Sequence, residues 1–263
     1  NNDSSKDTTS IKDRAFIMED SKYIKKRLFC SATPYKDQIE DNSIYGEIVE
    51  EIKVGELIKQ GYLSPISTII RDFKGECNLS LLIINEIKSK NKQKIVVFCN
   101  TQVNCESLYK QLKINTKETN IKPYLYISKK ATTFDIINMD ENLNKEDSDI
   151  LKQFEKEGEI SIIVTCKKIS MGYDFPLIDM VVFADPKCEK IEVAQCIGRG
   201  LRTIEYNPDK ICHVLLPVNE EGIEDSKFKT IISYFNYIKY ECDYDIIYNG
   251  EFNPSVRPKH PNT

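Results

Sequence analysis

Short apolar runs rich in β-branched residues alternate with amphipathic segments through most of the chain. The runs predicted as strands are 94–99, 124–128, 160–165, 180–186 and 211–218. The segments predicted as helices are 101–112, 151–158, 190–202 and 225–241. Strands that alternate with helices in this way predict an α/β fold, in which helices flank a parallel sheet.

Two of the predicted helices have a well-defined apolar face. In the first, Val103, Leu108 and Leu112 recur at helical spacing. The stripe of the last helix consists of Phe228, Ile231, Ile232, Phe235 and Ile238. Because such a stripe is stable only when it is buried, both helices are expected to pack on the sheet.

Segments outside this alternating unit have a different character. RLFCSATP, at 27–34, predicts an isolated strand and turn, and 54–62 predicts a helix ended by Gly61. The polar stretch 129–148 predicts a surface insertion. The tail from Asn249 is rich in proline and polar residues and is expected to be loose.

Length and composition narrow the class of protein. A chain of 263 residues with 40% hydrophobic content predicts one or two globular domains. No apolar run approaches the ~20 residues of a membrane span, and the polar start NNDSSKDTTS does not resemble a secretory signal. We therefore expect no membrane partner and an intracellular location, in cytoplasm, nucleus or a viral particle. Because residue 1 is Asn rather than Met, the chain is expected to be part of a longer protein.

The cysteines, the histidines and the net charge give further expectations. The nine cysteines include no CxxC pair and predict reduced thiols. With two histidines, His213 and His260, and no Cys/His cluster, we expect no metal site. A net charge of -4 gives no global attraction to nucleic acid, so any such binding requires a local basic surface.

The segment QCIGRGLR, at 195–202, has the most distinctive chemistry. If it is helical, Gln195, Arg199 and Arg202 share one face, and a pair of guanidinium groups suits the phosphates of a nucleotide. Gly198 and Gly200 each cost about 1 kcal/mol inside a helix, so something approaches the backbone closely or the helix frays there. The alternative is an ordinary solvated arginine face.

A second polar segment, TCKKISMGYDFP at 165–176, directly follows the strand at 160–165. Ligands of open parallel sheets bind beyond the carboxyl ends of the strands, where Thr165, Gly172 and Asp174 are expected. A hydroxyl, a bare backbone and a carboxylate suit phosphate and ribose recognition. The alternative is a glycine turn capped by Asp174.

These segments together resemble a known family. CSATP, VVFCNT, VTCKKISMGYDFP and QCIGRGLR resemble, in order and spacing, motifs III, IV, V and VI of superfamily 2 helicases. The stretch 45–65 resembles the join between the two motor lobes in the branch that contains type I and type III restriction translocases. The resemblance implies a RecA-like fold of the P-loop NTPase type.

The resemblance also implies a division of the chain. Residues 1–60 correspond to the end of the first RecA-like lobe and the interlobe linker, and 61–248 to the second lobe, the helicase C-terminal domain. Residues 249–263 form the tail. The implied function is that of the second motor lobe of an ATP-dependent helicase or translocase, with DNA or RNA and the first lobe of the same polypeptide as partners.

Roles follow for the residues that match the motifs. Arg199 and Arg202 resemble arginine fingers that reach the γ-phosphate, and Gln195 resembles the hydrogen-bonding residue that heads this motif. Gly172 and Asp174 match the motif whose acid lies near the ribose or the catalytic arginines. Nucleic-acid contacts are implied for Asn100, Thr101 and Thr165. Ser31 and Thr33 match the motif that couples nucleotide state to nucleic-acid grip.

The chain has no GxxxxGK[ST] phosphate loop, and no DExH-like acidic motif precedes residue 28. ATP and Mg²⁺ are therefore expected to be held mainly by the absent first lobe, and this fragment alone is expected to be inactive. One alternative function is a non-catalytic RecA-like interaction module. A dinucleotide-binding enzyme of another class is disfavoured because GxGxxG is missing. Lys167 and Lys168 are either phosphate contacts or solvated charges.

Overall fold

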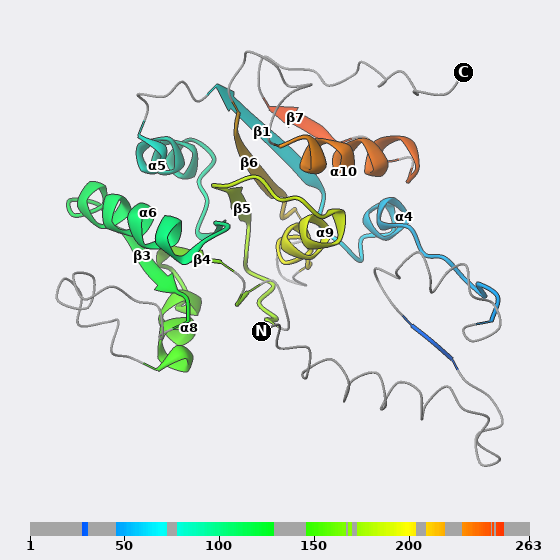
Figure 1. Ribbon diagram of the computed structural model, residues 1–263, viewed down its shortest axis with the longest axis horizontal. Coiled ribbons are helices and arrows are strands. Elements are labelled where there is room, and N and C mark those ends of the chain that lie inside the picture. Colours follow the sequence, from blue (N-terminus) through cyan, green and yellow to red (C-terminus); the bar gives the residue numbers. More distant parts are fainter. Residues whose placement is uncertain are drawn as a thin grey trace, which may run out of the picture. The chain divides into compact units, whose positions relative to one another are not determined.

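The structure is a computed structural model of the chain (Figure 1). The residues it describes are 28–30, 46–72, 78–128, 146–166, 168–169, 173–203, 209–218, 228–242, 244 and 246–249. Two compact units are formed by residues 1–51 and 52–263. In the first unit the described residues, 28–30 and 46–51, are exposed and have no regular secondary structure. The rest of the strand and turn predicted at 27–34 lies outside the described residues.

The second unit is built on one seven-stranded parallel sheet, as the alternating pattern predicts. Its strands are β1 (Ile66–Asp72), β2 (Lys94–Phe98), β3 (Ile121–Tyr126), β4 (Ile160–Thr165), β5 (Met180–Phe183), β6 (Cys212–Val218) and β7 (Ile247–Asn249). Their order across the sheet is β3-β4-β2-β5-β6-β1-β7. Because all pairs are parallel, the carboxyl ends of the strands lie at one edge and the amino ends at the other.

Helices cover both faces of this sheet (Figure 1). On one face lie α5 (Leu79–Ser89) and α6 (Gln102–Asn115); on the other lie α4 (Val54–Lys59), α8 (Asp147–Glu155), α9 (Lys190–Gly198) and α10 (Lys229–Tyr240). Strand side chains alternate between the two cores, so that Val96 and Phe98 face α9 while Ile95 and Val97 face α6. Burial on both faces explains the continuous apolar runs.

The helices differ from the sequence prediction in their bounds and, for α6, in the face that is buried. The helix predicted at 151–158 spans Asp147–Glu155, and Gly158 instead forms a turn with φ of +72°. α9 ends at Gly198 rather than at 202. In α6, Leu108 and Leu112 are buried as predicted, but Val103 is 70% exposed and Cys105 and Tyr109 are buried instead. The apolar face of α6 is therefore rotated from the predicted one.

Three elements were not predicted from the sequence. In β1 the polar residues Ser67 and Thr68 interrupt the apolar pattern although both are buried. The apolar segment 79–89 forms α5, which packs on the same face as α6. β7 has only three residues and extends the sheet beside β1. A short or polar strand has little pattern of its own and forms because the neighbouring strands pair with it.

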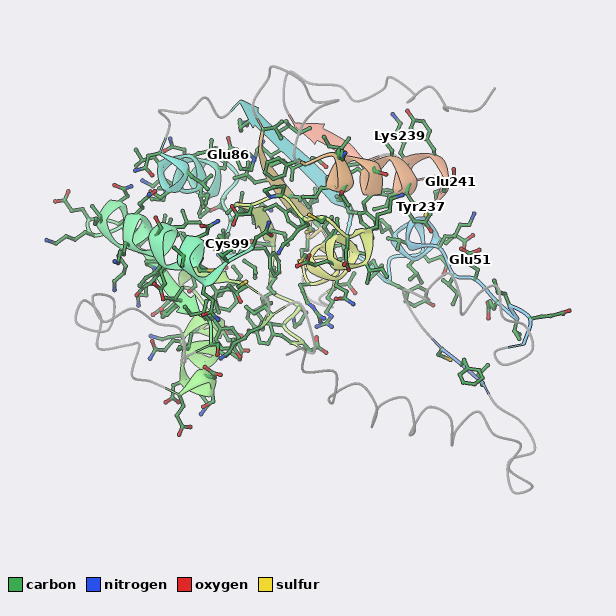
Figure 2. All side chains as sticks on the ribbon, viewed as in Figure 1. Glu51, Glu86, Cys99, Tyr237, Lys239 and Glu241 are labelled. Atoms are coloured by element: carbon green, nitrogen blue, oxygen red, sulfur yellow. The ribbon has the colours of Figure 1, made fainter. Side chains whose placement is uncertain are left out.

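The short helix α4 packs against the end of α10. A Cβ atom added to Gly55 would overlap the carbonyl oxygen of Cys242. The Nζ of Lys53, the residue before α4, donates a hydrogen bond of 3.0 Å to the carbonyl oxygen of Glu241, which lies with Tyr237 and Lys239 at the end of α10 (Figure 2). The predicted end of this helix at Gly61 is close to the observed one, and Gly61 has a φ of +79°.

Candidate functional site

Two arginines converge on one carbonyl group of the loop that follows β4. Arg199 donates a hydrogen bond of 2.8 Å to the carbonyl oxygen of Tyr173, and Arg202 donates one of 3.2 Å to the same oxygen. Arg202 also forms an ion pair with Asp174. Burial and the nearby charge of Arg202 lower the pKa of Arg199 from its usual value. Two like charges are therefore held side by side.

The sequence predicts that Arg199 and Arg202 share one face of a helix. In the structure the two arginines converge in a different way. Gln195 and Arg199 are separated by one turn of α9, whose C-cap is Arg199. Arg202 lies beyond the helix, in an extended segment that forms a β-bridge with Leu63. The helix ends at Gly198 because glycine is a poor helix former and the following backbone pairs elsewhere. The fold brings the two guanidinium groups together through Tyr173.

Tyr173 is itself anchored to α8. Its hydroxyl donates a hydrogen bond of 2.8 Å to Oε1 of Glu155, and its ring packs against Phe175 with the centroids 6.1 Å apart. Burial and the Glu155 carboxylate raise the pKa of the Tyr173 phenol well above its usual range. The carbonyl that receives both arginines therefore belongs to a fixed residue. Its role was not recognised in the sequence because a backbone acceptor has no sequence signal.

The arginine pair lies toward the amino-terminal edge of the sheet. Leu63 and Ser64 directly precede β1, and the backbone N–H of Ser64 donates a hydrogen bond of 2.6 Å to the carbonyl oxygen of Leu201. Asp174 contacts Arg202 here, whereas Thr165 ends β4 at the opposite edge. The structure thus separates two residues that the sequence assigned to one loop site. Gly172, the third, lies outside the described residues.

The carbonyl oxygen of Arg202 accepts two further hydrogen bonds. One comes from Oγ of Ser64 at 3.1 Å and the other from Nζ of Lys210 at 2.6 Å. Lys210 is buried, and burial lowers its pKa to about 8. Neither residue was singled out in the sequence, because both act on a backbone atom of a distant segment.

Gln195 is half-buried on α9. Asp174 is exposed, with 75% of its side chain accessible, so its ion pair with Arg202 is solvated. No group of three or more His, Cys, Asp or Glu residues in the described part of the chain is placed to hold a metal ion. The chemistry of this cluster, two cations and one carboxylate, fits a phosphate group and not a divalent cation.

Asn100 and Thr101 lie at the carboxyl-terminal edge, directly after β2. The backbone N–H of Asn100 donates a hydrogen bond of 2.8 Å to Asp185, and its side-chain Nδ2 donates one of 2.6 Å to the carbonyl oxygen of Pro186. Thr101 is the N-cap of α6, where its Oγ1 accepts a hydrogen bond from the backbone N–H of Asn104. The loops after β2 and β5 are thereby joined, and Asn100 and Thr101 are both exposed.

Thr165, at the end of β4 beside β2, is buried. Its Oγ1 has no hydrogen-bond partner in the described part of the chain. The neighbouring Cys166 thiol donates to the carbonyl oxygen of Asn100 at 3.0 Å, which links β4 to the loop after β2. The buried Lys187 donates to the carbonyl oxygen of Cys99 at 3.3 Å and pairs with Glu192 at 2.8 Å.

The sequence predicts Lys168 as either a phosphate contact or a solvated charge, and in the structure it is half-buried and ion-paired. Its Nζ forms an ion pair with Asp147, at the start of α8, and lies 4.7 Å from the centroid of the Tyr126 ring. Its side chain is 28% exposed. Lys168 therefore joins the loop after β4 to α8. Lys167, Ser31 and Thr33 lie outside the described residues.

The sheet and its helices define the class of protein, which is an α/β domain with a RecA-like fold. Residues 74–203 match the family model described as the helicase conserved C-terminal domain. The resemblance to a helicase C-terminal domain is therefore confirmed over that segment. Among the described residues, no helix is long and apolar enough to cross a membrane.

Solved structures of similar fold include two restriction enzymes. One is a fragment assigned as the HsdR subunit of a type I restriction enzyme from Vibrio vulnificus YJ016, with a TM-score of 0.61, 16% identity, and coverage of 83% of this chain and 42% of that one. The other is the ATP-dependent type ISP restriction-modification enzyme LlaBIII bound to DNA, with a TM-score of 0.51 and 14% identity. There the match covers 81% of this chain and 17% of that one.

Both likenesses show the fold. This chain spans less than half the length of either protein, at 42% and 17%. None of the curated proteins matches the chain significantly.

Proposed function

We propose that this chain is the second motor lobe of an ATP-dependent nucleic-acid helicase or translocase, and that it supplies arginine fingers to ATP bound by the first lobe. The observation that carries the proposal is the convergence of Arg199 and Arg202 on the carbonyl oxygen of Tyr173. Two guanidinium groups at one point form a strong anion-binding arrangement. The match of residues 74–203 to a helicase C-terminal domain supports the γ-phosphate of ATP as the proposed anion.

The hydrogen bonds at this point are well suited to exchange with a phosphate. A neutral carbonyl oxygen orients both arginines but competes weakly with a charged phosphate oxygen, because charge-assisted hydrogen bonds are roughly twice as strong. Arg202 is additionally balanced by the solvated carboxylate of Asp174. When the lobes close on ATP, the arginines stabilise the negative charge that develops on the transferred phosphoryl group, an effect worth ~10³ to 10⁵ in rate.

The other nucleotide contacts in the proposal are secondary. Gln195, one helical turn before Arg199, is proposed to donate a hydrogen bond near the nucleotide. Asp174 and Gly172 are proposed to lie beside the ribose or the arginines. ATP and Mg²⁺ are held mainly by the first lobe, since the chain has no phosphate loop and the arginine cluster contains a single carboxylate.

Nucleic acid is proposed to bind at the carboxyl-terminal edge, on the exposed Asn100 and Thr101. The N-terminus of α6 favours a phosphate there, because its amide groups and helix dipole attract negative charge. Buried as it is, Thr165 contributes by supporting this edge. Ser31 and Thr33 are proposed to couple the nucleotide state to this grip.

We also propose the division that the motifs imply. Residues 1–60 contribute the end of the first lobe and the linker, 61–248 the second lobe, and 249–263 a tail. ATP binding closes the lobes and product release opens them, so that the grip on nucleic acid shifts along the strand. Such a motor works inside a cell or a viral particle, where ATP and nucleic acid are available.

The test is the ATPase activity of the full-length protein that contains this chain, measured with and without single-stranded and duplex DNA and RNA. Arg199→Ala and Arg202→Ala are each expected to lower the nucleic-acid-stimulated rate by about 10³-fold. Lys190→Ala is the control, because Lys190 is an exposed cation at the start of the same helix. Wild-type rates in both arginine variants would overturn the proposal. Nucleic-acid binding with no hydrolysis by the wild type would instead support a non-catalytic interaction module.

A further inference from the structure

The segment that carries Arg202 is tied down from two sides. On one side the residues before β1 pair with it: Ser64 N–H donates to the carbonyl oxygen of Leu201 at 2.6 Å, and Thr203 Oγ1 donates to the carbonyl oxygen of Tyr62 at 3.3 Å. On the other side lies Lys210, which precedes β6. The backbone of Arg202 is thus held between the segment that precedes β1 and the residue that precedes β6.

Lys210 joins both halves of the arginine cluster. Its Nζ donates a hydrogen bond of 2.6 Å to the carbonyl oxygen of Arg202 and one of 2.7 Å to the carbonyl oxygen of Pro176. Pro176 lies three residues after Tyr173, whose carbonyl receives both guanidinium groups. One ammonium group therefore bridges the segment that provides the acceptor and the segment that provides the donors.

The burial of the Lys210 ammonium group has a cost in free energy. Lys210 is 5% exposed, and a buried ammonium group loses its hydration. That loss is reflected in a pKa lowered to about 8, while Cys212 and Asp179 partly offset it. The compensating interactions are the two carbonyl groups, both of which belong to the arginine cluster. Neither of them belongs to the sheet ladder.

We propose that Lys210 and Ser64 are positioning residues for the arginine pair. By fixing the carbonyl oxygen of Arg202 from two sides, and by holding it at a set separation from Pro176, they determine where both guanidinium groups present their N–H bonds. Catalytic charge stabilisation depends on such preorganisation, and a displacement of about 1 Å can cost 10²-fold in rate. This inference rests on the proposed function of the arginines.

The structure supplies a matched control. Lys92 is also buried, at 9% exposure, and donates one hydrogen bond of 3.2 Å to the carbonyl oxygen of Ile211. It lines the same cavity as Lys210, of about 320 Å³, but the hydrogen bond that it donates goes to Ile211 and not to Arg202. Lys92→Met and Lys210→Met therefore remove equivalent buried charges, and only the second releases Arg202.

The experiment compares steady-state ATPase kinetics of the full-length protein and its variants at saturating nucleic acid. Lys210→Met is expected to lower kcat by about 10- to 100-fold with little change in KM for ATP, because alignment matters most in the transition state. Lys92→Met is expected to keep kcat near the wild-type value. Ser64→Ala removes one of the two donors, and its kcat is expected to fall by about 3- to 10-fold.

Each outcome separates the two proposals. If Arg202→Ala keeps the wild-type rate in the same assay, the proposed function fails, whatever Lys210 does. If Arg202→Ala is inactive but Lys210→Met and Lys92→Met have equal kcat values, the positioning role is overturned. Thermal unfolding of every variant identifies a folding defect. Should Lys210→Met not fold, Ser64→Ala decides, and an unchanged kcat overturns the inference.

Discussion

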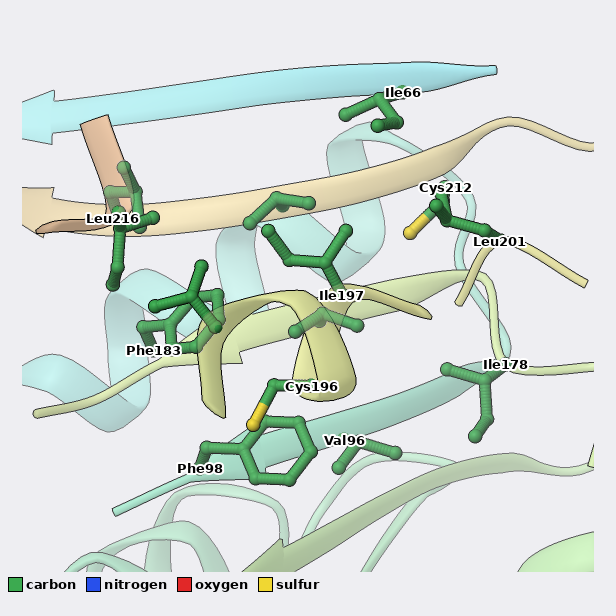
Figure 3. Close-up of a cluster of buried hydrophobic side chains, with 14 of the residues drawn as sticks. Ile66, Val96, Phe98, Ile178, Phe183, Cys196, Ile197, Leu201, Cys212 and Leu216 are labelled. Carbon is green, nitrogen blue, oxygen red and sulfur yellow. The ribbon is translucent and has the colours of Figure 1, made fainter. Parts of the chain in front are cut away.

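Gly200 lies directly against Cys212, so that a Cβ atom added to Gly200 would overlap the Sγ of Cys212. The same atom would also lie 3.3 Å from a methyl group of Val181. Figure 3 shows Cys212 in the buried cluster with Ile197 and Leu201, the residues on either side of the glycine segment. The two glycines of QCIGRGLR predict a close approach to the backbone, and the structure has one at Gly200.

Gly200→Ala is therefore expected to destabilise the chain by about 1–3 kcal/mol, because the cluster is already filled and the new methyl group forces side chains apart. The measurement is the free energy of unfolding from a urea or guanidinium titration. Gly198→Ala is the control. Nothing lies within 4 Å of a Cβ at that position, and alanine favours the end of α9 by up to about 1 kcal/mol. Equal effects of the two substitutions would contradict the assignment.

Lys94 is the buried residue that closes the end of α8. Its Nζ donates to the carbonyl oxygens of Phe154 and Lys156 at 2.7 Å each and to that of Glu159 at 2.9 Å. Burial lowers its pKa from the usual value, which shows the cost of placing it there. Lys94→Met leaves three carbonyl groups without this donor, so we expect the free energy of unfolding to fall by about 2–5 kcal/mol.

Lys156→Met provides the comparison for Lys94. Lys156 has a side chain that is 67% exposed and pairs with Glu159 at 2.7 Å, an arrangement that contributes little at a protein surface. We expect its unfolding midpoint to remain near that of the wild type. A Lys94→Met variant as stable as Lys156→Met would show that solvent replaces the lysine.

His213 is expected to make stability depend on pH. Burial, together with the charges of Lys92 and Lys90, lowers its pKa to about 4, whereas the Ile211 carbonyl and Glu86 oppose the shift. Below pH 6.5 the unfolded chain takes up a proton that the native state refuses until about pH 4, so stability is lost as the pH falls through this window. The maximum loss is roughly 3 kcal/mol, at 1.36 kcal/mol per pKa unit.

The corresponding measurement compares the wild type with His213→Gln. Unfolding free energies at pH 7, 6, 5 and 4.5 should fall less steeply in the variant, since glutamine takes up no proton. The carboxylates titrate in both proteins and cancel in the difference. Parallel curves for the two proteins would refute the role of His213.

Thr101 allows the proposed nucleic-acid contact to be separated from helix capping. Aspartate and serine both cap helices well, so Thr101→Asp and Thr101→Ser should leave stability nearly unchanged. Only aspartate places a negative charge where a phosphate is proposed to bind. We expect Thr101→Asp to weaken nucleic-acid binding by the full-length protein about 5- to 10-fold at low salt, and less at high salt. Equal affinity of both variants would argue against a phosphate contact at α6.

Much of the fold follows from local pattern. The apolar runs at 94–99 and 160–165 become β2 and β4 almost residue for residue, because a strand buried on both faces is apolar throughout. β1 was missed because its buried Ser67 and Thr68 look like surface residues when read alone. The edge strand β7 has too few residues to produce any pattern.

The candidate site divides in the same way. The sequence by itself determines which residue types carry the chemistry of the site. They are the two arginines of QCIGRGLR and the acid of TCKKISMGYDFP, and they can be found because charge and motif order are local properties. Where they meet was decided only by the tertiary structure. Arg202 leaves the helix and reaches the carbonyl oxygen of Tyr173 because Leu63, Ser64 and Lys210 hold its backbone. A backbone carbonyl group that accepts such hydrogen bonds leaves no imprint on residue type, and so only the folded chain reveals these contacts.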